Sequence, residues 1–396
     1  MSAPRLLLIS RCPPYPLHLG DRLIVYHLAE ELEQIGWEID LIALTNRPQD
    51  AAEVGAYDHL FRRVTLFPEA RRSPISYLRR LLLPGARWPS SAAQSWQPEM
   101  WRSIEAHVRE GEYDALHLFG GIHVYEMVGA LGERRAIITP YESYTLYLTR
   151  ALAAARGAAR LTAATQRALA ARYESFMFAP YAATVVVSEP DAETLRTLNP
   201  ALPVLVIPNG VDTYTFRPRP VGRIPALLFV GNYEYPPNVD AALRLATEIF
   251  PAVQAEVPEA RLWLVGNAPP PALMALASES VRVTGRVPDV RPYLARAGAF
   301  VSPLRLGAGI KNKVLEALAM GCPVAATPLS VDGIAVLDGE SALIAPAEGL
   351  AAACVRLLRD PDLRTRMGVA GRALIEQQYS WAGVAAQYAA LYREVG

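Results

Sequence analysis

The chain contains 396 residues, of which 52% are hydrophobic and 20% are charged, and its 39 Lys and Arg residues balance its 39 Asp and Glu residues. A chain of this length exceeds one ordinary hydrophobic core, so we expect two domains. The charge balance argues against general nucleic-acid binding, which requires a net basic surface. The three cysteines, Cys12, Cys322 and Cys354, are too few and too scattered for a disulfide framework or a zinc site.

No stretch of the sequence approaches the roughly 18 uninterrupted apolar residues that a membrane-spanning helix needs. The apolar run near the amino terminus is too short for a secretory signal, and Arg11 interrupts it. A cytoplasmic location is therefore the expectation.

In the first half of the chain, short apolar segments alternate with amphipathic ones, a pattern typical of strands and helices that follow one another. The expected strands are 5–10, 38–44, 64–67, 115–118, 136–139 and 183–188. The expected helices are 20–36, closed by Gly36, then 98–108, one long Ala- and Arg-rich helix from about 144 to 178, and 191–198.

A segment rich in Pro, Arg and Gly, residues 216–223, predicts a linker. The expected strands after it are 226–230, 260–265, 281–284 and 299–302, and the expected helices are 238–257, 347–359, 361–377 and 381–395. Strands that alternate with helices in this way predict parallel sheets covered on both faces. The expected fold is α/β, with two doubly wound domains whose ligand binds at the cleft between them.

Residues 301–334 are the most informative part of the sequence, because a strand, a turn with Gly307 and Gly309, a helix and a further strand follow in about thirty residues. Arg305, Lys311 and Lys313 crowd the start of the helix, where free amides and the helix dipole already attract anions.

Glu316 lies one to two turns further along that helix, roughly 6–9 Å along its axis at 1.5 Å per residue. The separation matches the distance between the diphosphate of a nucleotide and its ribose hydroxyls. In the alternative interpretation, Lys311 and Lys313 are solvated and Glu316 pairs with one of them.

Several stretches together resemble the retaining glycosyltransferases of family 4, which have the two-domain GT-B fold. The similar stretches in the second half are LLFVGNYEYPPNVDAALRLATEIFPAV, ARLWLVGNAPPP, the segment 281–334 and QQYSWAGVAAQYAALY. In the first half they are CPPYPLHLGDRLIVYHLAEELEQIGWEIDLIAL and VVVSEPDAETL with VLVIPNGVDTYTFRP. The resemblance implies a Rossmann-like acceptor domain over 1–218, with the helix 381–396 packed back on it, and a Rossmann-like donor-binding domain over 224–380.

The sequence also departs from the pattern of that family. The cleft helix of the family usually carries two Glu residues eight positions apart; here the second is Glu316, but Ala308 takes the place of the first, which commonly contacts the transferred sugar. The family often has an Arg and a Lys after the first Gly of the second domain, whereas this chain has Asn232 after Gly231. Arg305 and Lys311 are the best remaining partners for a diphosphate.

Transfer of a sugar from a nucleotide requires fixed donors and cations where charge develops on the leaving phosphate. The amides of Gly307, Gly309 and Ile310, with Arg305 and Lys311, meet this need without a metal. The Asp360–Asp362 pair has the spacing of a metal-binding DxD motif, but it lies between two helices and is interpreted as a helix cap. We expect no metal and no cofactor other than the nucleotide-sugar co-substrate, and the resemblance implies retention of the anomeric configuration.

Two loops are candidates for further donor contacts. The backbone around Val287 is placed to bind the base, although the same turn is also an ordinary strand-to-helix connection capped by Asp289. Gly20 would let the backbone of the first domain close over the phosphates, or it simply starts a helix.

The catalytic contact of the first domain is harder to predict, because family members often have a His after the fifth strand and this chain has none there. Glu142 follows that strand and is the candidate for holding a sugar hydroxyl or polarising an acceptor. The alternative is an acid that merely stabilises the first turn of a helix. His117 and His123 also follow strands, where a single His is more often structural.

Residues 71–88 contain five Arg and no acid, interleaved with apolar and aromatic side chains, and the Arg-rich helix near 150–172 adds further positive charge. Such a segment is suited to anionic lipid, as an enzyme with a lipid-linked acceptor would need. In the alternative, it is a mobile loop beside a solvated helix face. If it is an anchor, Arg79→Glu with Arg80→Glu should release the protein from anionic liposomes.

We therefore expect a retaining glycosyltransferase that acts from a nucleotide-sugar in polysaccharide or glycoconjugate synthesis, at the inner membrane face if residues 71–88 bind lipid. The alternatives are a nucleotide-sugar epimerase with the same fold, or a catalytically silent partner subunit, which the absence of the first Glu favours. The donor base and sugar, the acceptor, the linkage and the oligomeric state do not follow from the sequence.

Overall fold

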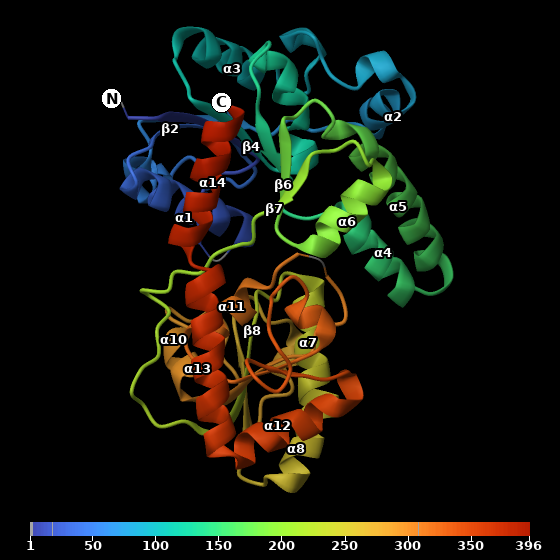
Figure 1. The fold of residues 1–396 in the computed structure, drawn as a ribbon. Coiled ribbons are helices and arrows are strands. Elements are labelled where there is room, and N and C mark those ends of the chain that lie inside the picture. Colours follow the sequence, from blue (N-terminus) through green and yellow to red (C-terminus); the bar gives the residue numbers. More distant parts are fainter. Residues whose placement is uncertain (1–2, 18, 308) are drawn as a thin grey trace. The chain divides into compact units, whose positions relative to one another are not determined.

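The computed structural model describes residues 3–17, 19–307 and 309–396. The chain divides into two compact units, one formed by the residues up to Pro208 together with Val384–Gly396, the other by Asn209–Gly383 (Figure 1). Each unit has its own parallel β-sheet and its own hydrophobic core. The expected α/β class with two doubly wound domains is confirmed.

The first unit is built on a seven-stranded parallel sheet with the order β3-β2-β1-β4-β5-β6-β7. Its strands are β1 (Arg5–Ser10), β2 (Glu38–Thr45), β3 (Arg63–Pro68), β4 (Ala115–Phe119), β5 (Ile137–Thr139), β6 (Ala183–Val186) and β7 (Val204–Val206). Its helices are α1 (Gly20–Gln34), α2 (Pro74–Leu82), α3 (Pro98–Glu110), α4 (Tyr144–Ala154), α5 (Gly157–Met177), α6 (Glu189–Leu198) and most of α14 (Trp381–Val395). The central strands are almost fully buried, as expected for a sheet covered on both faces.

The second unit is built on a six-stranded parallel sheet with the order β10-β9-β8-β11-β12-β13. Its strands are β8 (Ile224–Val230), β9 (Arg261–Val265), β10 (Val281–Val283), β11 (Ala297–Ser302), β12 (Val324–Ala326) and β13 (Leu343–Ile344). Its helices are α7 (Pro236–Arg244), α8 (Phe250–Glu256), α9 (Pro271–Met274), α10 (Arg291–Arg296), α11 (Asn312–Ala319), α12 (Leu350–Arg359) and α13 (Pro361–Gln378). This is the strand order of a Rossmann-like sheet, in which ligands bind beyond the carboxyl ends of the strands where the order reverses.

Two helices differ from the sequence prediction. The single helix expected over 144–178 is two helices, because Ala155 and Arg156 are extended and Gly157 has a φ of 58°. The helix expected over 238–257 contains a π-helical turn at 245–249, directly before Phe250 and Pro251. Proline has no backbone N–H to donate to the preceding turn, so the regular helix is interrupted there.

The boundary between the units also differs from the expected end of the first domain at residue 218, because the segment after Pro208 is bonded to the second unit. The guanidinium of Arg372 donates hydrogen bonds to the carbonyl oxygens of Thr213 and Phe216, and Val211 forms a bridge with Ser380. These bonds hold the segment against α13 and the residues that follow it.

Helix α14 begins in the second unit and continues into the first, as Figure 1 shows by its red ribbon beside the blue amino-terminal elements. Its buried Tyr392 packs edge to face on Trp37, with 5.3 Å between ring centroids, and its hydroxyl lies 2.7 Å from Nδ1 of His117 in β4. The carboxyl-terminal residues are therefore part of the first core.

Two helix ends in the second unit have defined caps, and the cap predicted at Asp360 is confirmed. Helix α11 ends in a Schellman motif, in which the amide of Gly321 donates to the carbonyl of Leu318 and the amide of Cys322 donates to that of Ala317. At the start of α13, the carboxylate of Asp360 accepts a hydrogen bond from the amide of Leu363, at 2.8 Å, so this residue is a helix cap.

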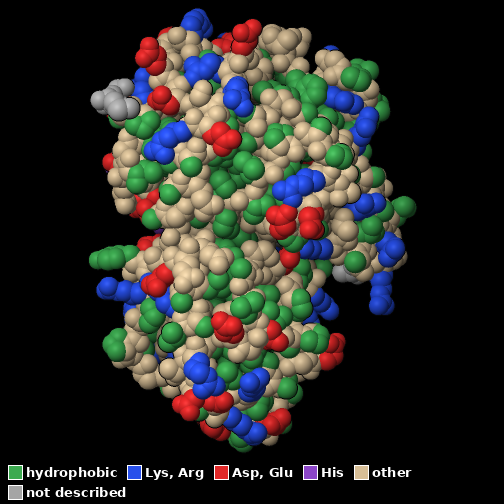
Figure 2. Space-filling model, in the orientation of Figure 1, with side chains coloured by type: hydrophobic (Ala, Val, Ile, Leu, Met, Phe, Trp, Pro, Cys, Tyr) green, Lys and Arg blue, Asp and Glu red, His purple; other side chains and the backbone are tan. Residues whose placement is uncertain are grey.

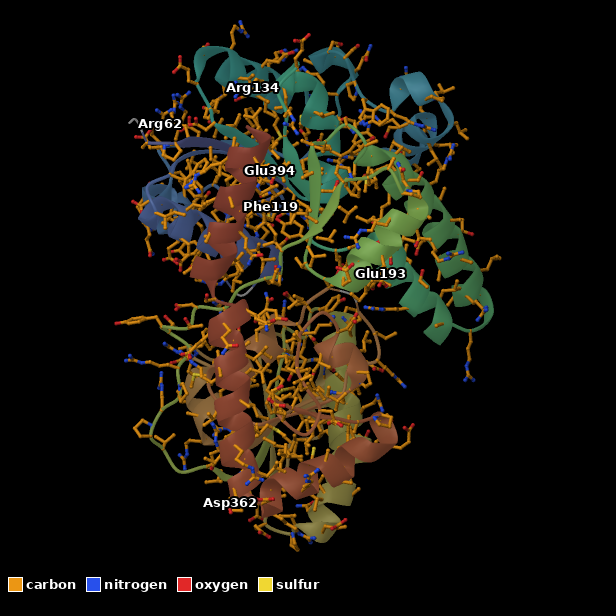
Figure 3. The ribbon with its side chains drawn as sticks, viewed as in Figure 1. Arg62, Phe119, Arg134, Glu193, Asp362 and Glu394 are labelled. Atoms are coloured by element: carbon orange, nitrogen blue, oxygen red, sulfur yellow. The ribbon has the colours of Figure 1, made fainter. Side chains whose placement is uncertain are left out.

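Charged side chains of both signs are interspersed over the face of the molecule in Figure 2, in keeping with the balanced composition. Arg62, which is labelled in Figure 3 and directly precedes the edge strand β3, pairs with the buried Asp40 of β2 at 2.9 Å. Within the described residues, no helix is both long enough and apolar enough to cross a membrane.

Candidate functional site

The strand order of the second sheet reverses between β8 and β11, and the residues that follow these two strands form the candidate site. The turn after β8 contains Gly231 and leads into α7, and the turn after β11 contains Arg305 and the two glycines. A Cβ atom added at Gly266, in the turn after β9, would meet the carbonyl oxygen of Gly231 at 1.8 Å. The turn after β8 is therefore packed closely against the turn after β9 at this edge of the sheet.

The turn after β11 has a backbone that brings it close to a neighbouring side chain. Gly307 and Gly309 have φ angles of 121° and 64°, which side-chain-bearing residues rarely adopt. A Cβ atom at Gly307 would lie 3.7 Å from the hydroxyl of Tyr235. Ile310 is buried and anchors the end of the turn, and Ala308, the expected departure from the family pattern, lies outside the described residues.

Lys311 is the residue that immediately precedes α11, and its ammonium group donates a hydrogen bond to the carbonyl of Gly309. It therefore stands at the amino-terminal end of a helix, where the first-turn amides have no intrahelical acceptor and the helix dipole is positive. The structure brings Lys311 together with Gly307, Gly309 and Ile310, as the sequence predicts.

Lys313 lies in the first turn of α11 and connects this helix to α7. Its ammonium donates to the side-chain oxygen of Asn238 and lies 4.7 Å from the centroid of the Phe229 ring. The amide nitrogen of Asn238 in turn donates to the carbonyl of Asn232, at 2.7 Å. Burial, with repulsion from Lys311, lowers the pKa of Lys313 to about 7.

Glu316 projects from α11 one turn beyond Lys313 and is half-buried. No hydrogen bond or ion pair within the described part of the chain involves its carboxylate, so the alternative in which Glu316 pairs with Lys311 or Lys313 is not what the structure contains. Burial raises the pKa of Glu316 to about 7, and the nearby charge of Lys313 opposes that effect. The carboxylate is available as an acceptor for hydroxyl groups.

Arg305 belongs to the turn after β11, but its guanidinium is paired with a carboxylate of the protein. Its guanidinium donates to both oxygens of Asp240 in α7, at 2.8 and 2.6 Å, and the side chain is 57% exposed. A contact of Arg305 with a diphosphate therefore stays a prediction, and it would require the guanidinium to share or leave Asp240.

Val287 lies between β10 and α10, also at the carboxyl edge of the second sheet. The turn is ordered by Asp289, whose carboxylate accepts hydrogen bonds from the backbone amide and Nε of Arg291, at 2.9 and 2.8 Å. These bonds lower the pKa of Asp289 although burial opposes them. Asp289 thus orders the turn, but the N-cap residue of α10 is Val290 and no side chain caps the helix, so the expected capping role of Asp289 is not found. Base binding by Val287 stays a prediction.

Gly20 and Glu142 belong to the first unit. Gly20 is exposed and is the first residue of α1, and Glu142 lies between β5 and α4. The amino-terminal end of α4 is capped from within the protein, because the carboxylate of Glu174 accepts hydrogen bonds from Ser143 Oγ and from the amides of Tyr144 and Thr145. Glu142 is thus not the acid of the first helical turn.

The two histidines considered as alternatives have structural partners. His117 is fully buried between the hydroxyl of Tyr392 and Oγ1 of Thr139, and His123 Nδ1 lies 2.7 Å from the carboxylate of Glu69. The structural interpretation of His117 is confirmed.

Only some of the side chains of the basic segment 71–88 are exposed to solvent. The side chain of Arg80 is buried, with its guanidinium paired to Glu126 and 3.6 Å from the ring centroid of Trp96. Arg72 donates to the carbonyls of Ile122 and His123. An Arg80→Glu change would place two carboxylates together in the core. Loss of liposome binding in that variant would therefore report damage to the fold and not the loss of a lipid contact.

The exposed side of α2 is instead apolar. Ile75 is 78% exposed and Leu82 is 65% exposed, with Leu78 between them on the same helical face and Leu83 just beyond it. Arg71 and Arg79 are the exposed arginines of this segment.

Sequence reasoning did not assign a site role to Asn238 or Tyr235, and no local motif marks either residue. Their proximity to α11 and to Gly307 depends on how β8 and β11 pair in the sheet. In the described residues, no group of three or more His, Cys, Asp or Glu side chains is arranged to hold a metal ion.

Comparisons with known proteins agree with the fold. The family "Glycosyltransferase Family 4" matches residues 23–214, and the family "Glycosyl transferases group 1" matches residues 224–360, which includes the turn after β11. A phosphatidyl-myo-inositol mannosyltransferase of Mycolicibacterium smegmatis is 30% identical over 205 residues, which are 48% of this chain and 51% of that protein. The chain thus spans about half the length of the curated relatives it matches.

Two solved structures share the fold over nearly their whole length. Sucrose-phosphate synthase from Thermosynechococcus elongatus has a TM-score of 0.73 and 20% sequence identity, with 99% of this chain and 98% of that one covered. The Anabaena protein HepE, solved in complex with UDP, has a TM-score of 0.68 and 14% identity, with 99% and 100% covered. Two Rossmann-like units are the architecture of the GT-B class of proteins, and the two solved structures share this fold with the chain. This chain belongs to the family-4-like glycosyltransferases of that class.

Proposed function

We propose that this protein transfers a sugar from a nucleoside-diphosphate sugar to an acceptor hydroxyl, with retention of the anomeric configuration and without a metal ion. The observation that carries the proposal is the pairing of a cationic helix start with a carboxylate one turn further on. Lys311 stands at the positive end of α11, and the Glu316 carboxylate has no hydrogen-bond or ion-pair partner among the described residues.

Each group in the site has a role that follows from its chemistry. The diphosphate would lie at the start of α11, against the amides after Gly309 and the ammonium of Lys311, where negative charge grows as the sugar leaves. Glu316 would accept hydrogen bonds from the ribose hydroxyls. The backbone at Val287 would meet the base, and Glu142 of the first unit would hold a hydroxyl of the sugar or acceptor.

A donor-binding experiment tests the site. We expect one nucleoside diphosphate among UDP, GDP and ADP to raise the thermal midpoint in the presence of EDTA, because a ligand that binds only the folded state stabilises it. Glu316→Gln and Lys311→Ala should each weaken that binding about tenfold or more, as the loss of a hydrogen bond to a charged group implies. Arg282→Gln, an exposed change outside the site, is the matched control.

The proposal fails if no nucleotide binds, or if the Glu316 and Lys311 variants bind as well as the control. The stereochemistry needs its own measurement: the anomeric proton coupling in the NMR spectrum of the first-formed product distinguishes retention from inversion. Turnover that requires a divalent cation would contradict the metal-independent step.

We further propose that the acceptor is lipid-linked and that α2 contacts the membrane. The support is the exposed apolar face of α2, formed by Ile75, Leu78 and Leu82, with exposed Arg71 and Arg79 beside it. An amphipathic helix with apolar residues on one face and arginines nearby is suited to an anionic lipid surface. The mannosyltransferase relative is named for a phosphatidyl-inositol substrate, which is consistent with this acceptor class.

Liposome flotation tests the membrane contact. We expect the wild-type protein to float with anionic vesicles and Leu78→Glu with Leu82→Glu to abolish flotation while the thermal midpoint stays near that of the wild type. Leu161→Glu with Leu169→Glu, which changes exposed leucines of α5, is the matched control. Flotation that survives the α2 changes would refute the assignment of the surface.

A further inference from the structure

The segment that leads from the unit boundary into β8 is held rigidly by two arginines. Arg372 of α13 donates to the carbonyl oxygens of Thr213, at 2.9 Å, and of Phe216. Arg223 donates to the carbonyls of Leu294, Ala297 and Gly321, at 2.9, 2.8 and 2.7 Å. The residues between these two anchors therefore have a defined path, although their composition is that of a linker.

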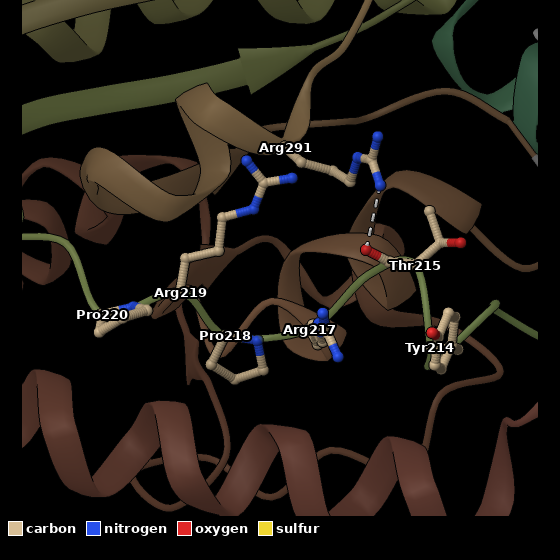
Figure 4. A pocket seen from close by; sticks show the side chains of 7 residues that line it. All are labelled: Tyr214, Thr215, Arg217, Pro218, Arg219, Pro220 and Arg291. Atoms are coloured by element: carbon tan, nitrogen blue, oxygen red, sulfur yellow. Dashed lines mark hydrogen bonds between the residues drawn. The ribbon is translucent and has the colours of Figure 1, made fainter.

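A cavity of about 670 Å³ opens along this path, within the second unit (Figure 4). Its lining consists of Tyr214, Thr215, Arg217, Pro218, Arg219, Pro220 and Arg291. The volume lies in the range of small-molecule sites. None of these residues is acidic, and the two prolines restrict the backbone, so the lining combines three guanidinium groups with a stiff frame.

The arginines of the cavity are only partly neutralised. Arg291 is held by Asp289, at 2.8 Å, and by the carbonyl of Thr215, at 3.4 Å, which is the dashed line in Figure 4. Arg219 approaches the same Asp289 carboxylate at 3.8 Å, and the guanidinium carbon of Arg217 lies 5.4 Å from the ring centroid of Tyr214. Asp289 thus pairs with two of the three arginines, and Asp212 also attracts Arg291 electrostatically. Within the described residues, no ion pair involves Arg217.

We infer that this cavity binds the phosphate group of a small soluble phosphorylated compound. Guanidinium groups bind phosphate through paired hydrogen bonds, and three of them around one cavity favour a group that carries more than one negative charge. The apolar part of the lining consists of the rings of Tyr214, Pro218 and Pro220 and not of long aliphatic side chains that would enclose an acyl chain, which favours a soluble compound over a phospholipid.

The cavity is distinct from the candidate donor site. Its lining shares no residue with the turn after β11 or with α11, and it is formed by the segment before β8 and the first residue of α10. Asp289 belongs to the same turn as Val287, so an anion that competes for Arg291 and Arg219 would act on the turn proposed to meet the base.

Calorimetric titration of the full chain with inorganic pyrophosphate, at physiological ionic strength, tests the inference. We expect Arg217→Gln with Arg219→Gln to weaken pyrophosphate binding about tenfold or more, since each removes charge-assisted hydrogen bonds. Arg282→Gln, which changes an exposed arginine of the same unit, should leave this binding event unchanged, whereas Lys311→Ala should remove only a separate pyrophosphate binding event at the donor site.

Three results would overturn the inference: no pyrophosphate binding by the wild type, binding lost in Lys311→Ala but kept in the double variant, or equal weakening in Arg282→Gln. If the double variant unfolds, Arg217→Gln alone decides, because the contact of Arg217 with the described residues is the Tyr214 ring. Nucleotide binding at the donor site is measured separately in each variant, so a failed donor site and a failed anion site give different results.

Discussion

His117 is a titratable side chain that the fold keeps neutral. It is fully buried in β4, and its two ring nitrogens lie 2.7 Å from the hydroxyl of Tyr392 and 2.8 Å from that of Thr139. Burial lowers the pKa of His117 from 6.5 to about 3, since no carboxylate among the described residues offsets the cost of burying a charged ring.

This burial predicts that acid destabilises the first unit. Between the folded pKa of about 3 and the unfolded pKa of 6.5, the unfolded chain binds the additional proton, so stability falls as the pH falls. From pH 7 to pH 5 we expect a loss of about 2 kcal/mol from this residue, and His117→Gln should remove most of it.

Denaturation monitored by tryptophan fluorescence at both pH values measures the effect. His59→Gln, at an exposed position, is the control and should keep the wild-type pH dependence. If the free energy of unfolding of the His117 variant changes with pH as much as that of the wild type, groups other than His117 determine the pH dependence.

Which of the site residues could be predicted depended on the range of the interaction. The turn after β11, Lys311 and Glu316 follow from a local pattern of glycines, cations and one carboxylate, and the structure brings them together. The contact of Lys313 with Asn238 joins residues 75 positions apart, and the pairing of Arg305 with Asp240 joins residues 65 apart. Such contacts depend on strand order, which a single motif does not reveal.

The elements of secondary structure were predicted well where each had a strong local signal and poorly where one residue decided the outcome. The central strands are continuous apolar runs, and all of them were expected. The edge strands β7, with three residues, and β13, with two, are too short to stand out from their surroundings. The break between α4 and α5 was missed because the Ala- and Arg-rich composition on both sides favours helix.

Gly157 accounts for that break and provides a test at the level of the element. It is the first residue of α5, has a φ of 58° and is in open space, so a methyl group would strain the backbone without a clash. We expect Gly157→Ala to destabilise the first unit by about 1–2 kcal/mol. Gly85→Ala, also in open space but without a positive φ, should change stability by less than about 0.5 kcal/mol. Equal effects in urea denaturation would mean that the backbone conformation of Gly157 is not what separates the helices.

At the scale of the whole molecule, the two-unit organisation follows from the alternation of strands and helices, whereas the boundary at Pro208 does not. Residues 216–223 have the composition of a linker, but hydrogen bonds from Arg372 to the carbonyl of Phe216 and from Arg223 to the carbonyl of Gly321 fix this segment within the second unit. The carboxyl-terminal residues, in contrast, follow the second unit in the sequence but belong to the first unit and complete its core.

Because the carboxyl-terminal residues complete the first core, we expect a chain that ends at Gly383 to lose the first core and to keep the second. Removing residues 384–396 takes away Tyr388 and Tyr392, exposes Trp37, and leaves His117 without its Tyr392 partner. The second core contains none of these residues, so its strands should stay folded.

Hydrogen exchange measured by mass spectrometry separates the two units. In the shortened chain we expect β4 and β5 to exchange rapidly while β8 and β11 remain protected, because exchange reports local opening free energies. Tyr392→Phe in the full chain is the matched control: it keeps the ring packing, loses the hydroxyl bound to His117, and should weaken protection of β4 only slightly. Rapid exchange in both sheets would instead mean that the units fold as one, and protection of both would mean that the first core does not depend on α14.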